Sequence, residues 1–166
     1  MPLTAAQILF LQKAATAARA AQGLTGIPAS ITIAQAILES GWGRSQLAMQ
    51  ANNYFGIKAR QGDDYAEFPT TEFENGVKEE VMAAFARYPS PIESFQAHAA
   101  LLLTLPRYAR CMECKRVPAA FAQELQNCGY STSPTYAVSL MELVREFNLT
   151  QYDNPPEPTT QAKSAA

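Results

Sequence analysis

Glu39 is the residue whose type and surroundings most clearly suit a chemical role. It closes an apolar, helix-like segment, and the run Ser40-Gly-Trp-Gly43 interrupts the helix directly after it. A carboxyl group at a helix end, beside the only tryptophan of the chain, can lie in an apolar pocket, where burial raises its pKa. A carboxyl that keeps its proton near neutral pH is suited to act as a general acid. The alternative is that Glu39 is a solvated residue of the last helical turn and Trp42 a core anchor.

Glycoside hydrolysis is a reaction that such an acid could serve. It needs one protonated acid for the leaving oxygen and usually a second carboxylate across the scissile bond. Three glutamates near a predicted turn at Asn75-Gly76 are candidates for this second group, namely Glu67, Glu72 and Glu74. Glu72 would lie on a strand just before the turn, and it would face Glu39 across a groove if the hairpin folds over the helical part. The spacing alone also fits glutamates that are simply solvated.

Other catalytic and ligand-binding patterns find little support in the chain. The single histidine, His98, lies inside an amphipathic helical segment without a nucleophile elbow, so we interpret it as a packed or surface residue rather than part of a triad. The chain contains neither a P-loop nor a Gly-x-Gly-x-x-Gly pattern. Asp63-Asp64 is a weak metal pattern that a solvated loop explains better, since hard cations need more oxygen ligands. We therefore expect no cofactor and no metal.

The three cysteines include a Cys-x-x-Cys pattern at Cys111 and Cys114, which raises zinc and redox interpretations. A structural zinc site takes four ligands, and His98 does not stand at a matching spacing. A redox Cys-x-x-Cys belongs to a βαβ pattern, which the sequence lacks. We interpret these residues as ordinary thiols, and a disulfide from Cys128 to Cys111 or Cys114 is the competing interpretation.

Composition indicates one globular domain. The chain has 166 residues, of which 48% are hydrophobic and 17% charged, so it can form a core and general disorder is not expected. The formal net charge of -2 gives no electrostatic reason to bind nucleic acid or an anionic membrane. No apolar stretch approaches the roughly 20 residues that span a bilayer. Residues 1–7 lack the basic stretch followed by an apolar stretch that is typical of a signal peptide, so no secretory signal is expected.

Local signals predict two helices before the first candidate acid. Thr4 and Gln7 form a capping box at the start of a helix that is expected to stop at Gly23. A second helix begins near Pro28, which suits the first helical position. Four apolar residues of this helix recur at helical spacing and are expected in the core: Ile33, Ala34, Ile37 and Leu38. Glu39 lies at the edge of this apolar stripe.

A small hairpin and three further helices complete the predicted fold. The Asn-Gly turn, the strongest short hairpin signal, separates two strands over residues 65–73 and 77–87. Capping and stop signals then predict helices over residues 90–105, 118–128 and 133–148. We place one domain over residues 1–150. Residues 151–166 are rich in proline and lack apolar periodicity, so we expect them to form a disordered tail.

Six motifs follow one another along the chain: Ala34-Gln-Ala-Ile-Leu-Glu-Ser-Gly-Trp-Gly-Arg-Ser-Gln-Leu-Ala48, Asn53-Tyr-Phe-Gly-Ile-Lys-Ala59, Thr70-Thr-Glu-Phe-Glu-Asn-Gly76, Phe85-Ala-Arg-Tyr-Pro-Ser-Pro-Ile-Glu-Ser-Phe95, Pro106-Arg-Tyr-Ala109 and Asn127-Cys-Gly-Tyr-Ser-Thr-Ser-Pro-Thr-Tyr-Ala137. As an ordered set they resemble the glucosaminidase family of peptidoglycan hydrolases, glycoside hydrolase family 73. This family includes the C-terminal domain of the flagellar rod-associated hydrolase and many autolysins. The resemblance covers residues 5–150.

The resemblance implies a fold, a reaction and three catalytic positions. The fold is α+β and mainly α, lysozyme-like, with a helical lobe, a small β-hairpin lobe and a substrate groove between them. The reaction is endo-type cleavage of the β-1,4 bond from N-acetylglucosamine to N-acetylmuramic acid. Glu39 matches the family's catalytic acid, and Glu72 matches the glutamate of its hairpin lobe. Tyr130 matches the tyrosine of a Gly-Tyr-Ala-Thr-Asp motif that reads Gly129-Tyr-Ser-Thr-Ser133 here, and Ser133 is still expected to cap the next helix.

Aromatic residues near these positions are candidates for sugar binding under the same resemblance. Tyr54, Phe55 and Tyr108 are candidate sugar platforms, although large rings are also common in protein cores. Trp42, which lies beside the acid, and Tyr136, in the helix that follows, are two further candidates.

Several alternatives stay open from the sequence. Glu72 could activate a water with inversion, or the N-acetyl group of the substrate could assist. A muramidase or lytic transglycosylase could use the same scaffold, and a non-catalytic wall-binding or assembly module is a further alternative. Expected partners are peptidoglycan glycan strands, with an immunity protein or a delivery or rod structure as additional candidates. Action in the periplasm or cell wall without a signal peptide would require a non-Sec route, phage lysis or membership of a longer protein.

Overall fold

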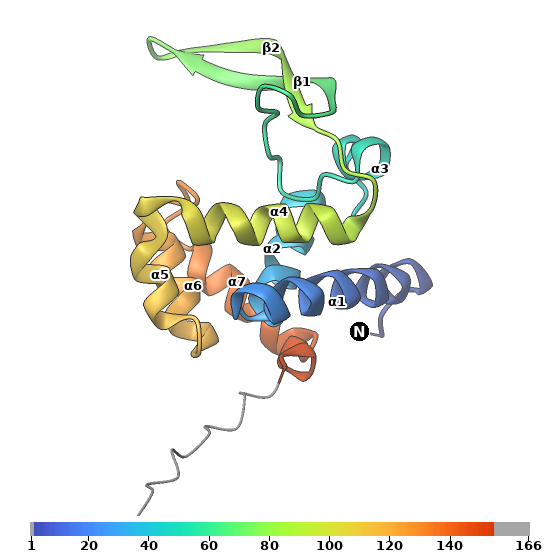
Figure 1. Ribbon diagram of the computed structural model, residues 1–166, viewed down its shortest axis with the longest axis vertical. Helices are drawn as coiled ribbons and strands as arrows, with labels where there is room; N and C mark the ends of the chain where they lie inside the picture. Colours follow the sequence, from blue (N-terminus) through green and yellow to red (C-terminus); the bar gives the residue numbers. More distant parts are fainter. Residues whose placement is uncertain (1, 155–166) are drawn as a thin grey trace, which may run out of the picture.

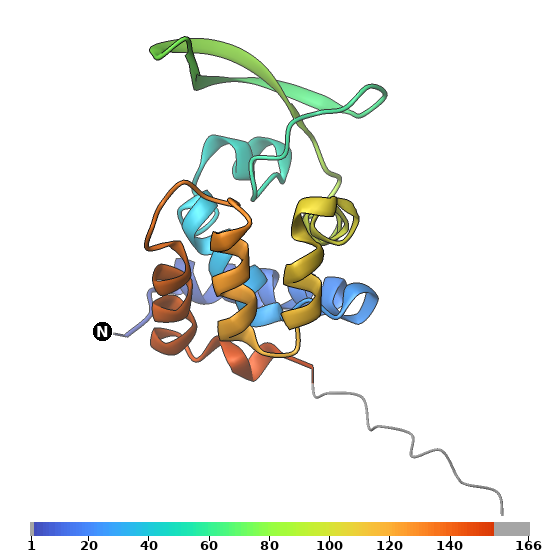
Figure 2. The same ribbon diagram turned by 90° about the vertical axis from the view of Figure 1, so that its left-hand side faces the viewer.

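The computed structural model describes residues 2–154, whose helices form a body from which one β-hairpin projects (Figure 1). A view at right angles shows the same separation of the hairpin from the helices (Figure 2). The elements are, in chain order, α1 (Ala5–Thr25), α2 (Ala29–Ser40), α3 (Gln46–Ala51), β1 (Tyr65–Glu74), β2 (Val77–Ala86), α4 (Pro91–Thr104), η1 (Pro106–Tyr108), α5 (Ala109–Cys114), α6 (Pro118–Asn127), α7 (Tyr136–Glu146) and η2 (Leu149–Tyr152). None of these helices is both long and apolar enough to cross a membrane.

Helix α2 is the central element of the helical body. It packs against α1, α6, α7 and η2, and residues 29–37 are buried without interruption. Leu38 is 45% exposed, so its prediction as a core residue is wrong. Leu38 and Glu39 are exposed on one side of the last turn of α2, whereas Ile37 and Ser40 of the same turn stay buried. The other predicted core positions of this helix are confirmed: Ile33, Ala34 and Ile37.

The start of α2 is capped by a residue that the sequence placed in a disordered tail. Pro28 occupies the N-cap position instead of the predicted first helical position, and it provides no side-chain cap. Asp153 takes this role, because the backbone N–H and the hydroxyl of Ser30 donate to its two carboxylate oxygens, each at 2.8 Å. A carboxylate also suits the positive end of the helix dipole. Residues 151–154 therefore belong to the folded body, and the remainder of the predicted tail, residues 155–166, lies outside the described residues.

Helix α1 starts as predicted but ends later. Its capping box is confirmed, since the Thr4 hydroxyl oxygen accepts from the Gln7 N–H at 3.2 Å and the Gln7 side chain accepts from the Thr4 N–H at 2.9 Å. Gly23 does not stop the helix. The chain turns out of the helix only at Gly26, whose φ of 73° is left-handed. The N–H of Gly26 donates to a carbonyl of the last turn at 2.7 Å, as a C-cap does.

The hairpin forms where the sequence predicts it. Strands β1 and β2 pair antiparallel, with residues 65–74 opposite residues 77–86. Asn75 and Gly76 connect them with φ angles of 51° and 79°, and two positive values are typical of the type I′ turn that Asn-Gly favours. The open end is tied to the body by Asn53, whose amide nitrogen donates to two backbone carbonyls at 2.8 and 2.9 Å. This anchor matters because a two-stranded sheet is marginally stable alone.

The helices after the hairpin follow the predicted order, with a later start for α7. Ser90 caps α4 as predicted and accepts a backbone N–H of the first turn at 3.2 Å. Helix α7 begins at Tyr136, because Ser133 does not cap it. The Ser133 hydroxyl instead accepts the N–H of Thr135 at 3.3 Å, within the turn that precedes the helix. The short helices α3 and α5 were not predicted.

Candidate active site

Glu39 stands at the end of α2 and is bound by Tyr136 from α7. The Tyr136 hydroxyl donates to Glu39 Oε1 at 3.2 Å, and the side-chain amide of Gln35 donates to that hydroxyl oxygen at 3.1 Å. Gln35 and Glu39 lie one helical turn apart, so they share a face of α2. The buried Gln35 therefore leaves the Tyr136 hydrogen free to point at the carboxyl group. Because Oε1 is an acceptor in this arrangement, an acid proton is carried by Oε2.

The surroundings of Glu39 favour its protonated form. Burial raises the pKa of the Glu39 carboxyl, and the weaker opposing effect of the Tyr136 hydrogen bond lowers it. The side chain is open to solvent, although protein atoms crowd its carboxyl group. Burial and the negative charge of Glu39 raise the pKa of the Tyr136 phenol, so this hydroxyl keeps its proton and remains a donor. The raised pKa expected from the sequence is thus present, and it suits a general acid.

The turn after Glu39 holds three consecutive residues in the left-handed conformation. Gly41, Trp42 and Gly43 have φ angles of 57°, 63° and 72°. This conformation is unusual for a bulky side chain, whereas glycine adopts it freely. At Gly43 a Cβ atom would lie 2.9 Å from the ring of Phe10, so a larger residue would not fit there without a shift. The tight turn fixes where α2 ends and therefore where Glu39 stands.

A cavity of about 440 Å³ lies beside Glu39. Its size falls within the roughly 300–1,000 Å³ that small-molecule sites usually have. The end of α2, the segment before the hairpin, α4, η1 and the loop after α6 contribute its wall, through Glu39, Phe55, Gly56, Ile57, Lys58, Ala59, Arg60, His98, Leu101, Arg107, Tyr108 and Tyr130. Among the described residues of this wall, Glu39 is the only carboxylate, and Lys58, Arg60 and Arg107 are basic.

A chain of aromatic contacts connects the far wall of the cavity to Glu39. Phe55 stacks on His98 with ring centroids 3.9 Å apart, and His98 Nε2 lies 3.0 Å from the Tyr130 hydroxyl. Tyr130 in turn stacks on Tyr136 at 5.5 Å. Burial lowers the pKa of His98 to about 3, so its ring is neutral and can exchange a hydrogen bond with Tyr130. The sequence predicted either a packed or a surface position for His98, and the structure shows the packed one. Its contact with Tyr130 was not predicted.

The structure divides the predicted aromatic residues into two groups. Phe55, Tyr108 and Tyr130 line the same cavity as the acid. Tyr136 is only 3% exposed and is not among the residues that line the cavity; it reaches the site through its hydroxyl, and its role as a groove residue stays a prediction.

Trp42 and Tyr54 do not line the cavity either. Trp42 packs edge-on against Phe10 and Phe147, with centroids 5.6 and 4.8 Å away. Tyr54 packs against Phe95 at 5.6 Å. Both rings act as structural anchors around the acid in this structure, and their predicted contact with sugar finds no support in it.

Glu72 lies on β1 and outside the cavity wall. It forms an ion pair with Lys58, which does line the cavity, and the hairpin register sets Glu79 directly opposite it. Lys58 therefore offsets the repulsion between two neighbouring carboxylates. Glu67 is exposed on the same strand, and the side chain of Glu74 lies outside the described part of the chain. The assignment of Glu72 as the second carboxylate stays a prediction.

Three basic residues of the cavity wall were missed from the sequence: Lys58, Arg60 and Arg107. The Arg107 guanidinium lies 4.5 Å from the ring centroid of Tyr108 and donates to its hydroxyl, so it is held in place. The sequence did contain a signal, since all three residues stand within or directly beside motifs already quoted for their aromatic residues. Positive charge around a single acid is suited to an anionic carbohydrate polymer.

A helical body, a projecting hairpin and a carboxylic acid of raised pKa in a cavity wall define the class of lysozyme-like glycosidases. The sequence matches the glucosaminidase family, described as mannosyl-glycoprotein endo-beta-N-acetylglucosaminidase, over residues 15–149. The chain belongs to this family of glycoside hydrolases, as its motifs predicted.

Named relatives and solved structures agree with this membership. The chain is 39% identical to exo-glucosaminidase LytG of Bacillus subtilis over 129 residues, which is 75% of this chain and 45% of that protein. It is 36% identical to peptidoglycan hydrolase FlgJ of Salmonella typhimurium over 151 residues, 87% of this chain and 48% of that protein. The catalytic domain of the autolysin Auto from Listeria monocytogenes superposes with a TM-score of 0.83 at 32% identity, covering 92% of this chain and 90% of that one.

These comparisons confirm the predicted lysozyme-like fold with its helical and hairpin parts. The chain spans about half the length of the curated relatives it matches.

Proposed function

We propose that this chain hydrolyses peptidoglycan as an endo-β-N-acetylglucosaminidase, cutting the β-1,4 bond from N-acetylglucosamine to N-acetylmuramic acid. The observation that carries the proposal is the carboxyl group of Glu39 in the cavity wall, whose pKa is raised by burial. Membership of the glucosaminidase family and the names of its relatives, an exo-glucosaminidase and a peptidoglycan hydrolase, support the same substrate class.

The first chemical step is a proton transfer from Glu39. Its Oε2 proton passes to the glycosidic oxygen, the bond from that oxygen to the anomeric carbon breaks, and the electron pair leaves with the muramic acid sugar. Glu39 becomes a carboxylate, which the Tyr136 hydroxyl stabilises through its bond to Oε1. The Tyr130 hydroxyl, held by His98 at 3.0 Å, contacts the sugar in the cavity and orients it.

The second step needs a nucleophile at the anomeric carbon. Glu72 activates a water for this attack once the hairpin closes over the substrate, because in the open arrangement it lies outside the cavity wall. Lys58 stays paired with Glu72 during this closure, because the two side chains form an ion pair and Lys58 already lines the cavity. Assistance by the N-acetyl group of the substrate is the competing route. Inversion at the anomeric carbon would distinguish the Glu72 route from the assisted one, which retains configuration.

The place of action and the partners follow from the proposed substrate. The chain would act on peptidoglycan strands in the periplasm or cell wall. An immunity protein that covers the cavity, or a delivery or rod structure, remains a prediction from the sequence. A pull-down from the organism's own envelope fraction, competed with soluble peptidoglycan fragments, would identify a partner that occupies the cavity.

Product analysis tests the proposed bond. Purified peptidoglycan is digested, the products are reduced with borohydride, and the reducing ends are identified by mass spectrometry. Reduced N-acetylglucosamine supports the proposal. Reduced N-acetylmuramic acid, or its anhydro form, would assign the chain to the muramidase or transglycosylase alternatives. Binding of peptidoglycan without any product would favour the wall-binding module.

A further inference from the structure

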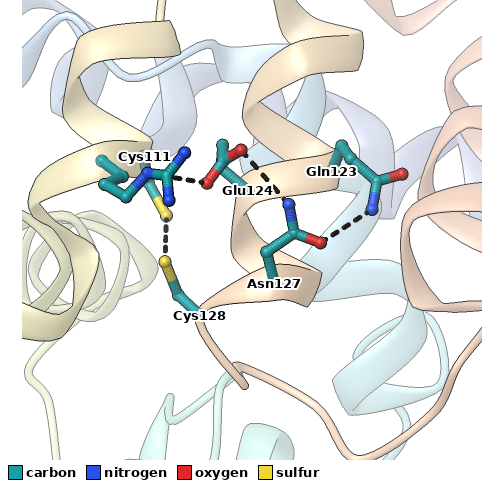
Figure 3. A network of polar contacts seen from close by, with 6 residues as sticks. Cys111, Gln123, Glu124, Asn127 and Cys128 are labelled. Carbon is teal, nitrogen blue, oxygen red and sulfur yellow. Dashed lines mark hydrogen bonds and ion pairs between the residues drawn. The ribbon is translucent and has the colours of Figure 1, made fainter.

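Two of the three cysteines meet at the junction of α5 and α6. Cys111 is fully buried on α5, and Cys128 is the C-cap residue of α6. Their sulfur atoms lie 3.5 Å apart, and both residues are thiols in this structure (Figure 3). The two thiols belong to different helices, so their approach is a feature of the tertiary fold and not of the Cys-x-x-Cys pattern.

Neighbouring contacts hold these two helices together independently of the thiols. Arg110 on α5 forms an ion pair with Glu124 on α6 at 3.7 Å. Asn127 donates to Glu124 at 3.2 Å, which fixes the last turn of α6 just before Cys128. Helices α5 and α6 also pack against each other. A disulfide bond requires a sulfur separation of about 2.05 Å, so the thiols need to approach only slightly further.

We propose that Cys111 and Cys128 are a modification site, which becomes an intramolecular disulfide in an oxidising compartment. The inference rests on the proposed function only for that compartment, because action on peptidoglycan takes place outside the cytoplasm, where disulfides form and persist. The partner in the reaction is a disulfide oxidant, such as an oxidised thiol–disulfide exchange protein or glutathione disulfide. Each cysteine loses one hydrogen atom, the sulfur–sulfur bond forms, and the oxidant takes up two electrons and two protons to become two thiols.

The burial of the two sulfur atoms sets the order of events. Cys128 is partly exposed, so it reacts first with the oxidant and forms a mixed disulfide. Cys111 then displaces the thiol of the oxidant from Cys128. Burial raises the pKa of the Cys111 thiol to about 12, so this residue is a poor first target and the closing step is the slow one.

The bond would clamp one wall of the cavity. Cys111 follows closely on Tyr108, and Cys128 shortly precedes Tyr130. Both tyrosines line the cavity, and their ring centroids are 6.1 Å apart. The cysteines are separated by only 17 positions, and a crosslink over such a span stabilises chiefly by restricting the unfolded chain. The oxidised enzyme should therefore keep its cavity wall at temperatures where the reduced enzyme loses it.

The test counts thiols and locates the bond. The full chain is reduced, freed of reductant and exposed to glutathione disulfide, after which free thiols are measured under denaturing conditions. The reduced chain has three thiols, and the oxidised chain should have one. Trypsin cuts after Arg110 and Lys115, so Cys111 and Cys114 share a peptide. Mapping under non-reducing conditions therefore uses the Cys114→Ser variant, in which a peptide linked to Cys128 can contain only Cys111.

Matched variants make the outcome decisive. Cys114→Ser should still lose both thiols on oxidation, whereas Cys128→Ser, a change at a partly exposed helix end, should form no intramolecular bond. Oxidation should raise the melting temperature of Cys114→Ser by about 5–10 °C and leave that of Cys128→Ser unchanged. Retention of all thiols, a bond that requires Cys114, or oxidation without a thermal shift would overturn the inference. These readouts involve no turnover, so they stand apart from the fate of the proposed activity.

Discussion

Replacement of Tyr136 by phenylalanine isolates the hydrogen bond that this residue makes to the proposed acid. The ring of Tyr136 is buried and stacks on Tyr130, so Tyr136→Phe keeps this packing and removes only the hydroxyl. That hydroxyl donates to Glu39 at 3.2 Å and accepts from Gln35 at 3.1 Å. The change therefore separates the electrostatic role of the hydroxyl from the structural role of the ring.

The expected magnitude follows from the type of bond. A hydrogen bond to a charged group contributes about 1.5–3 kcal/mol. The distance to Glu39 is long for a hydroxyl donor, and the Glu39 residue as a whole is exposed, so the lower limit applies. A loss of about 1.5 kcal/mol in the stabilisation of the Glu39 carboxylate that forms during proton transfer corresponds to roughly a tenfold fall in kcat.

The same hydrogen bond also determines in which direction the pH–rate profile should shift in Tyr136→Phe. The Tyr136 bond favours the ionised form of Glu39 and lowers its pKa, so its removal raises that pKa further. A general acid works while it is protonated, and activity is lost as pH rises through its pKa. The alkaline limb of the kcat/KM profile should therefore move to higher pH in Tyr136→Phe, even though the plateau falls.

The assay is a pH–rate profile on soluble peptidoglycan fragments, between about pH 5 and about pH 9. Tyr65→Phe is the matched control, because Tyr65 is 55% exposed on β1 and outside the cavity wall. Its profile should coincide with that of the wild type. An alkaline limb that moves to lower pH in Tyr136→Phe, or one that does not move while kcat falls, would refute the assignment of Glu39 as an acid tuned by Tyr136.

Three further predictions concern Glu39, Glu72 and His98. Because burial raises the pKa of Glu39, the folded state loses stability as pH rises through that pKa. Glu39→Gln should therefore be at least as stable as the wild type in urea denaturation near about pH 8. A clear loss of stability in the variant at that pH would contradict the reasoning. Glu72→Gln should lower kcat at least about tenfold with little change in melting temperature, since exposed ion pairs contribute about 0–1 kcal/mol, whereas Glu67→Gln should do neither. The neutral His98 has a pKa of about 3 against an ordinary 6.5, so the unfolded chain binds the extra proton and stability falls from pH 6.5 down to about 3. His98→Gln should make this fall shallower, and an equally steep fall in the variant would exclude His98 as its cause.

Short-range signals in the sequence identified the elements of the fold. The capping box at Thr4, the cap at Ser90 and the Asn75-Gly76 turn each depend on neighbouring residues, and all three form as predicted. Contacts with distant residues were not predicted. The start of α2 lies near Pro28 as expected, but its cap was missed, because Asp153 binds it from the other end of the chain and no local pattern announces that contact.

The same distinction applies to the site. Periodicity places Leu38 on the apolar face of α2 but cannot show which side of the last turn is covered by other elements. Aromatic residue type cannot decide between a sugar platform and an anchor, and the tertiary fold assigns Trp42 to anchoring and Phe55 to the cavity wall. The place of Glu39 at a helix end could be predicted because the residues that end its helix are its immediate neighbours. Its partner Tyr136 could be identified only as a nearby aromatic, because the hydrogen bond joins residues 97 positions apart.

The most direct test of the account compares the wild type with Glu39→Gln on purified peptidoglycan, with Glu67→Gln as the matched control. The three proteins are first shown to unfold at similar temperatures, and the release of reducing-end N-acetylglucosamine is then followed by mass spectrometry. A general acid contributes about 10²–10⁴-fold to the rate, so Glu39→Gln should release the product at least about 100-fold more slowly while Glu67→Gln matches the wild type. Near-wild-type release by a folded Glu39→Gln would contradict the central claim that Glu39 is the acid of this site.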